Sequence, residues 1–158
     1  TGMYYGTGDV LHIIPNGRLK NEAKYGDDLN TDLINDSLDE FANDHLDIEA
    51  IEVELTTQDI EKVQKRVRDV YVDFASGRPK SPVHYDYFKA ILGYFFQDQA
   101  EIIDSATDLC GITSFICTDL PNRIFIDALQ REISNQKFTL PNYYYWRKRE
   151  NGKITLLP

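Results

Sequence analysis

Cysteine is scarce in this chain of 158 residues, which contains only Cys110 and Cys117 alongside three histidines. The two cysteines lie outside any Cys-x-x-Cys pair and away from any cluster of histidines. Structural zinc sites need four close Cys or His ligands, and disulfide-stabilised small domains need a higher cysteine density. The sequence therefore predicts no metal site, no disulfide framework and no cofactor.

Long apolar runs are also lacking. The segment Ala90–Phe96 falls far short of the roughly 20 apolar residues that span a bilayer. The sequence begins Thr1-Gly2-Met3, with no basic stretch followed by an apolar one, so no signal peptide is expected. We therefore expect a soluble protein without an integral membrane segment, with the cytoplasm as the favoured compartment.

Basic residues are in the minority, with 17 Lys and Arg against 26 Asp and Glu and a net charge of −9. Such a charge repels phosphate groups, which argues against nucleic acid or an anionic membrane as the partner. Hydrophobic residues make up 42% and charged residues 27%, the balance of a globular protein. At this length we expect a single domain over residues 1–158.

The first part of the chain carries signals for a hairpin, a helix and a further strand. Val10–Ile14 is an apolar run that ends at a Pro-Asn-Gly turn, and Leu19–Ala23 is expected to return antiparallel to it. Apolar residues close to helical spacing predict one amphipathic helix over Thr31–Asn43. A second strand is expected within Ile48–Leu55.

A helix is predicted after Thr56, because Asp59 three residues later completes a capping-box pattern. We expect this helix to stop at Gly77 and Pro79. Its apolar stripe consists of Ile60, Val63, Val67, Val70 and Phe74.

Two further helices are expected in the second half. The aromatic segment Tyr85–Phe96 is interpreted as a largely buried helix. Proline is tolerated only in the first turn of a helix, so Pro121 predicts a helix that begins near Thr118 or Asp119, directly after Cys117.

The C-terminal region is expected to form a hairpin of strands 143–149 and 153–157, joined by an Asn-Gly turn. Together with residues 10–14 and 48–55, these strands are predicted to form one small antiparallel sheet packed against the helices. The expected fold class is α+β.

Cys117 is the candidate nucleophile. A cysteine at a helix N-terminus meets the partial positive charge of unpaired amides, which favours the thiolate and can stabilise an oxyanion. Thr118 and Asp119 are competent residues for that helix start. The alternative is that Cys117 is a small buried apolar residue, and Cys110 is a rival for the nucleophile.

The run Phe115–Leu120 resembles the aromatic-hydrophobic-Cys-Ser-Glu-Leu motif of the circularly permuted papain-like hydrolases, the YiiX-like branch of the NlpC superfamily. Tyr85-Asp86-Tyr87 with residues 91–94, and Gly17–Gly26, are similar to the segments that precede this motif in the family. The resemblance implies a papain-like fold, with Tyr85, Asp86 and Thr118 at the cleft. It also implies a cysteine hydrolase that cleaves an amide or ester through an acyl-enzyme.

The family places its histidine where this chain has Asp9, so the base must be found elsewhere. His12 lies on the same predicted strand, and a bulge near its start would turn the imidazole to the required face. The resemblance then implies His12 as general base and Glu22 as its orienting group, with Asp9 and Asn21 as rival orienters. His84 is the alternative base.

Two functions follow from these features. The first is hydrolysis of a peptide, isopeptide or lipid acyl bond, with a cell-wall peptide among the substrates. The second is an inactive papain-like binding module that holds a protein partner through the old cleft or the acidic surface. An imidazole beside the Cys117 sulfur would favour the first, and Asp9 alone beside it would favour the second.

Overall fold

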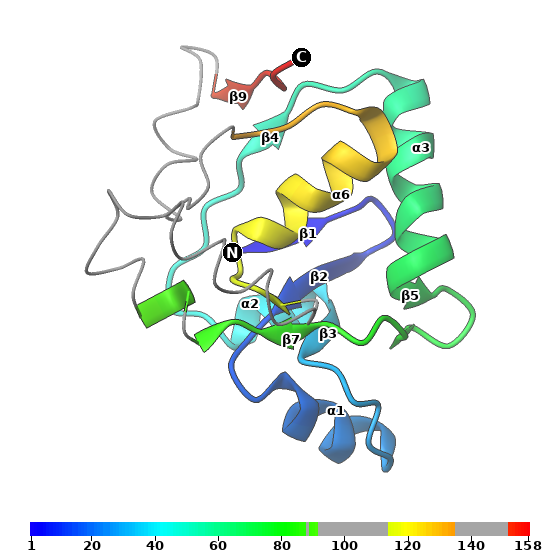
Figure 1. The fold of residues 1–158 in the computed structure, drawn as a ribbon, viewed down its shortest axis with the longest axis vertical. Coiled ribbons are helices and arrows are strands. Elements are labelled where there is room, and N and C mark those ends of the chain that lie inside the picture. Colours follow the sequence, from blue (N-terminus) through cyan, green and yellow to red (C-terminus); the bar gives the residue numbers. More distant parts are fainter. Residues whose placement is uncertain (88, 92–113, 135–151) are drawn as a thin grey trace.

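A three-stranded antiparallel sheet forms the centre of the computed structural model, which describes residues 1–87, 89–91, 114–134 and 152–158 (Figure 1). Its order is β1 (Gly2–Tyr4), β2 (Asp9–Ile13), β3 (Leu33–Ser37). All five residues of β2 pair with β3, from Asp9 opposite Ser37 to Ile13 opposite Leu33. The strand predicted at residues 10–14 is therefore confirmed.

The segment after β2 is a helix, α1 (Gly17–Tyr25), so the predicted return strand is wrong. Asn16 adopts a left-handed conformation with φ 56°, which turns the chain out of the sheet. Gly17 then passes so close to β3 that an added Cβ would lie 2.2 Å from the Asp32 carbonyl oxygen. The following Leu, Lys, Glu and Ala residues are good helix formers, and the helix ends at Gly26 with φ 78°.

The prediction of a helix over residues 31–43 is also wrong for the first part of that segment. Residues 33–37 form β3, and only α2 (Leu38–Asn43) is helical. Ser37 and Glu40 make a capping box that fixes the start of α2. β3 is buried on both faces, so Leu33 and Ile34 are both apolar although they point to opposite sides of the sheet. Together with Leu29, Leu38 and Phe41 they reproduce the spacing of an amphipathic helix.

The capping box of Thr56 and Asp59 is confirmed at the start of α3 (Thr57–Arg66). The helix continues as a π-helical turn, η1 (Val67–Tyr71), and ends there rather than at Gly77. The chain then forms a short hairpin of β5 (Val72–Asp73) and β6 (Arg78–Pro79).

The helix predicted after Cys117 is confirmed as α6 (Asp119–Leu129), with Thr118 at its N-cap and Pro121 in its first turn. α6 packs against α3 (Figure 1, yellow and green). The guanidinium of Arg66 on α3 donates to Asp127 on α6 at 2.8 Å.

The remaining strands form parallel pairs. β7 (His84–Tyr85) pairs with β8 (Ser114–Phe115), and β4 (Glu52–Val53) pairs with β9 (Lys153–Ile154). The prediction of one antiparallel sheet that contains residues 10–14, 48–55 and 153–157 is therefore wrong. β4 and β9 add no strand to the central sheet, because each pairs only with the other among the described strands.

Some predictions concern residues that the structure does not describe. Strand 143–149 and Cys110 lie outside the described residues, as does most of the predicted helix Tyr85–Phe96. Within that helix, Tyr85 belongs to β7, whereas Tyr87 and residues 89–91 are helical.

The described residues form a mixed α+β structure around one buried cluster that extends from Met3 to Leu156. None of the helices in the described part is long and apolar enough to cross a membrane. The most deeply buried large side chains of the cluster are Leu11, Ile13, Leu33, Val67, Val72, Val83, Leu120, Ile124 and Ile154.

Candidate functional site

Cys117 lies where the chain passes from β8 into α6, as expected, and it is a partly exposed free thiol. A tight turn fixes this position, because the Ile116 N–H donates to the Asp119 carboxylate and the Asp119 N–H donates to the Ile116 carbonyl, both at 3.0 Å. Lys89 Nζ lies 3.0 Å from the same carboxylate and anchors the turn.

Tyr85 is the neighbour of this turn, since the β7–β8 pairing sets it opposite Phe115. Burial raises the pKa of the Tyr85 hydroxyl, and the nearby charge of a Cys117 thiolate raises it further. The Tyr85 ring meets the Tyr87 ring edge-on, with centroids 5.2 Å apart. The thiol therefore lies beside an aromatic surface.

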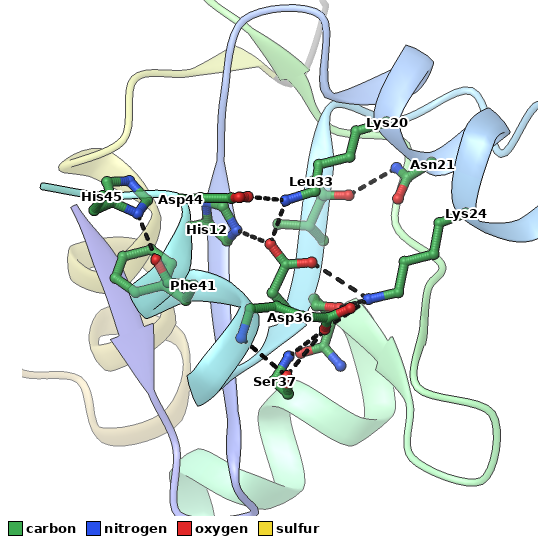
Figure 2. Close-up of polar contacts among 12 residues, drawn as sticks. His12, Lys20, Asn21, Lys24, Leu33, Asp36, Ser37, Phe41, Asp44 and His45 are labelled. Carbon is green, nitrogen blue, oxygen red and sulfur yellow. Dashed lines mark hydrogen bonds and ion pairs between the residues drawn. The ribbon is translucent and has the colours of Figure 1, made fainter.

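His12 lies elsewhere, in the middle of β2, with 3% of its surface exposed. Its Nε2 is 2.9 Å from Asp36 Oδ2 on β3, and its ring contacts the Phe41 ring edge-on (Figure 2). No hydrogen bond between described residues joins this imidazole to Cys117. The structure pairs His12 with Asp36 and does not assemble the expected thiol–imidazole pair.

Asp36 is 1% exposed and is held by two lysines of α1 in addition to His12. Lys20 Nζ lies 2.7 Å from its Oδ2, and Lys24 Nζ lies 3.3 Å from its Oδ1 (Figure 2). Both lysines also reach α2 or its C-cap, since Lys24 contacts Glu40 at 3.1 Å and Lys20 contacts the C-cap residue Asp44 at 2.7 Å. This Asp36 cluster therefore ties α1, β3 and α2 together.

The cluster determines the charge states of its members. Burial alone would raise the pKa of Asp36, but hydrogen bonds from His12 and Lys20 outweigh burial and hold it far below its ordinary value of 3.8. Burial lowers the pKa of His12 from its ordinary value of 6.5, more than the hydrogen bond to Asp36 raises it. At neutral pH Asp36 is therefore ionised and His12 is neutral, with its Nε2–H donating to the carboxylate.

The three candidate orienters occupy other places. Glu22, expected on a return strand, lies on the exposed face of α1, because residues 17–25 are helical. Asn21 is buried, and its amide donates to the carbonyls of Thr31 and Leu33, which pins α1 to β3. Asp9 accepts a hydrogen bond from Asn35 at 3.2 Å. The partner of His12 is therefore Asp36, which no motif in the sequence indicated.

A pocket of about 330 Å³ opens between α1 and β7, and we call it the α1–β7 pocket. Asp32 builds it, because its Oδ1 accepts the Arg18 N–H at 3.1 Å and its Oδ2 accepts the Tyr85 N–H at 2.9 Å. One carboxylate thus fixes the start of α1 to β7. The pocket is lined by Asn16, Arg18, Leu19, Asp32, His84, Tyr85 and Tyr87.

His84, the alternative base, borders this pocket, with its Nδ1 3.9 Å from Asp32 Oδ2. Of the residues expected at a cleft, Tyr85 borders the pocket, whereas Asp86 and Thr118 are buried. The Asp86 carboxylate accepts the Lys89 N–H at 2.7 Å, so it caps the short helical segment that follows.

The one sequence signal for these missed aspartates is the presence of two acids, Asp32 and Asp36, in the apolar context of Leu33 and Ile34. In the described part of the chain, no group of three or more His, Cys, Asp or Glu side chains is arranged to hold a metal ion.

Comparisons of this chain with models of protein families, with curated proteins and with solved structures return no match.

Proposed function

We propose that this chain is a binding module on a papain-like scaffold, and that it holds a peptide segment of a partner in the α1–β7 pocket. The observation that carries this proposal is that hydrogen bonds fix the backbone on both sides of the pocket while several of its lining side chains are exposed to solvent. Asp32 fixes both walls by accepting backbone N–H groups, while the His84 side chain is 37% exposed and Tyr87 as a whole residue is 44% exposed. Preformed pockets with a few convergent polar groups are the usual form of a binding site.

The position of His12 supports binding over hydrolysis. A general base must come within hydrogen-bond reach of the group from which it takes a proton. The His12 Nε2 is held by Asp36, and its ring is covered by Phe41. A buried imidazole in these contacts is suited to holding the sheet and α2 together.

Panning a random heptapeptide phage library on the immobilised chain tests the proposal. We expect enriched peptides whose binding is lost in Tyr87→Ala and retained in Tyr4→Ala, a matched change of another exposed tyrosine on β1. Peptides that bind both variants equally, or no enrichment over blank resin, would refute a binding site in the α1–β7 pocket.

A second candidate, the thiol hydrolase, is favoured by the partly exposed Cys117 at the start of α6. In this candidate the thiolate attacks the carbonyl carbon of an amide or ester, the amine or alcohol leaves with a proton, and water then releases the acid. His84, one residue before Tyr85, is the proposed base, because His12 is held by Asp36.

The rate at which Cys117 reacts with iodoacetamide, measured as a function of pH, separates the two candidates. An activated thiolate reacts well below the ordinary cysteine pKa of about 8.5, and His84→Ala would then raise the midpoint. A midpoint at or above about 8.5 that is unchanged by His84→Ala would eliminate the hydrolase. Cys110→Ser serves as the background for every variant, so that only one thiol titrates.

A further inference from the structure

Arg18 differs from the other arginines in the described part of this acidic chain. Its side chain is exposed at the pocket, and no carboxylate of the described residues lies within 4.0 Å of its guanidinium. Each of the others has a carboxylate within that distance, and they are Arg66, Arg68, Arg78, Arg123 and Arg131.

Asp32 is the acid that lines the same pocket as Arg18, and it contacts Arg18 through the backbone N–H. Its two carboxylate oxygens accept the N–H groups of Arg18 and Tyr85. These bonds hold the carboxylate in place, and the Arg18 guanidinium, with its fork of five N–H donors, takes no part in them. An arginine of this kind is suited to bind a planar carboxylate through two parallel hydrogen bonds.

Apolar surface lies next to this donor. Leu19 is 57% exposed and Tyr87 is 44% exposed, and both line the same pocket as Arg18. The Tyr87 hydroxyl donates to Asn16 at 2.9 Å, which fixes the ring at the pocket rim. An apolar side chain placed there would cover both residues.

We propose that Arg18 binds a carboxylate of the peptide ligand while Leu19 and Tyr87 receive the apolar side chain next to that carboxylate. This inference rests on the proposed function and specifies its ligand. The carboxylate belongs either to the C-terminus of a peptide or to an acidic side chain within it, and both present the same two oxygens.

Three small probes test the inference by ¹H–¹⁵N chemical-shift titration of the full chain. N-acetylphenylalanine carries a terminal carboxylate, N-acetylphenylalanine amide carries none, and N-acetylglutamyl-phenylalanine amide carries a side-chain carboxylate. We expect the acid to shift the amides of Arg18, Leu19 and Tyr87 and to bind roughly tenfold more tightly than the amide, the usual scale of a hydrogen bond to a charged group.

Arg18→Gln should reduce affinity for N-acetylphenylalanine roughly tenfold and leave that for its amide unchanged. Arg18→Lys should restore part of the loss, because it keeps the charge without the planar fork. Arg68→Gln removes the same charge from an exposed arginine away from the pocket and should have no effect. Binding of the glutamyl probe at least as tight as that of the acid would assign the carboxylate to a side chain, and weaker binding to a C-terminus.

The inference is overturned if acid and amide bind with equal affinity, if Arg18→Gln changes neither, or if no probe shifts the pocket amides. In the first two cases the pocket still binds ligands and the proposed function stands. In the third case the phage selection decides separately whether the pocket holds any peptide.

Discussion

At the scale of single residues, the feature with the largest energetic consequence is the buried carboxylate of Asp36. The side chains of His12, Lys20 and Lys24 all contact this carboxylate. Together these contacts offset the free-energy cost of removing the charge from water. Taking away the charge would leave His12 and two lysine side chains directed at a neutral group.

Asp36→Asn should therefore reduce the free energy of unfolding by about 3 kcal/mol, the scale of breaking a buried ion pair. Urea denaturation measures the change. Asp44→Asn is the matched control, because Asp44 contacts the same Lys20 but is 55% exposed, and it should leave stability unchanged. Equal effects of the two substitutions would show that burial of Asp36 is not what makes its ion pairs important.

The pH dependence of stability should report on His12. Its pKa is lowered in the folded state, so the unfolded chain binds the proton more readily and stability falls as pH drops below 6.5. The slope reaches up to about 1.4 kcal/mol per pH unit until His12 itself is protonated. A second loss begins below pH 3.8, where Asp36 takes up a proton in the unfolded chain while the folded chain keeps it ionised.

Urea denaturation at intervals between pH 8 and pH 4.5 measures this slope. His12→Asn should abolish the slope between pH 6.5 and pH 5.5, above the range where carboxyl groups such as Glu40 titrate, whatever its effect on stability at pH 8. His45→Gln, a change of an exposed histidine beside the same Phe41, should leave it in place. Stability that stays level from pH 7 to pH 5 in the parent chain would contradict a lowered pKa of His12.

At the scale of elements, helix starts are set by local side chains. The Thr56 hydroxyl accepts the Asp59 N–H at 3.2 Å, which satisfies one of the unpaired amides of α3. Val63 of α3 packs in the buried core, and the helix then continues as η1.

Thr56→Ala should reduce the free energy of unfolding by about 1 kcal/mol, because it removes this cap. Thr57→Ala is the matched control, because Thr57 is the first residue of the helix and the capping hydroxyl of α3 is that of Thr56. Differential hydrogen exchange of the first turn of α3 measures the local effect, and equal protection in the two variants would mean that the cap contributes nothing.

The same distinction between local and distant partners explains which elements could be predicted. The starts of α3 and α6 follow from residues within three positions of each other, so Thr56 and Pro121 sufficed. Residues 19–23 were predicted to form a strand, because nothing in their own sequence shows that Gly17 passes against Asp32, a contact between residues 15 positions apart.

The candidate site follows the same rule. Cys117 was correctly placed at a helix start, which is a local property. The pairing of His12 with Asp36 joins residues 24 positions apart, and the fixing of Tyr85 by Asp32 joins residues 53 positions apart. No spacing within one element predicts such contacts, because they depend on how β3 packs between its neighbours.

At the scale of the whole molecule, the two ends of the described chain share one core. Met3 of β1 belongs to the same buried cluster as Ile154 and Leu156, which are 2% and 4% exposed. The Glu132 and Leu157 backbones also exchange two hydrogen bonds, which hold this segment beside α6.

Removal of residues 152–158 should therefore cost about 3–6 kcal/mol, the sum for two buried aliphatic side chains. That is a large part of the stability of an ordinary domain, about 5–15 kcal/mol. We expect a much lower midpoint in thermal unfolding followed by circular dichroism. Removal of the exposed Pro158 alone is the control, and equal midpoints for the two truncations would show that Ile154 and Leu156 are not part of the stabilising core.

The parallel pairing of β4 with β9 also has a kinetic consequence. Thr155 donates to Glu54 across 101 positions of the chain, so this contact forms only after a very long loop has closed. Closing such a loop costs entropy before any contact compensates for it, and parallel pairs of this kind slow the folding reaction. The three strands of the central sheet lie within residues 2–37 and can assemble early, whereas the core beneath β4 stays open to water until the last segment docks.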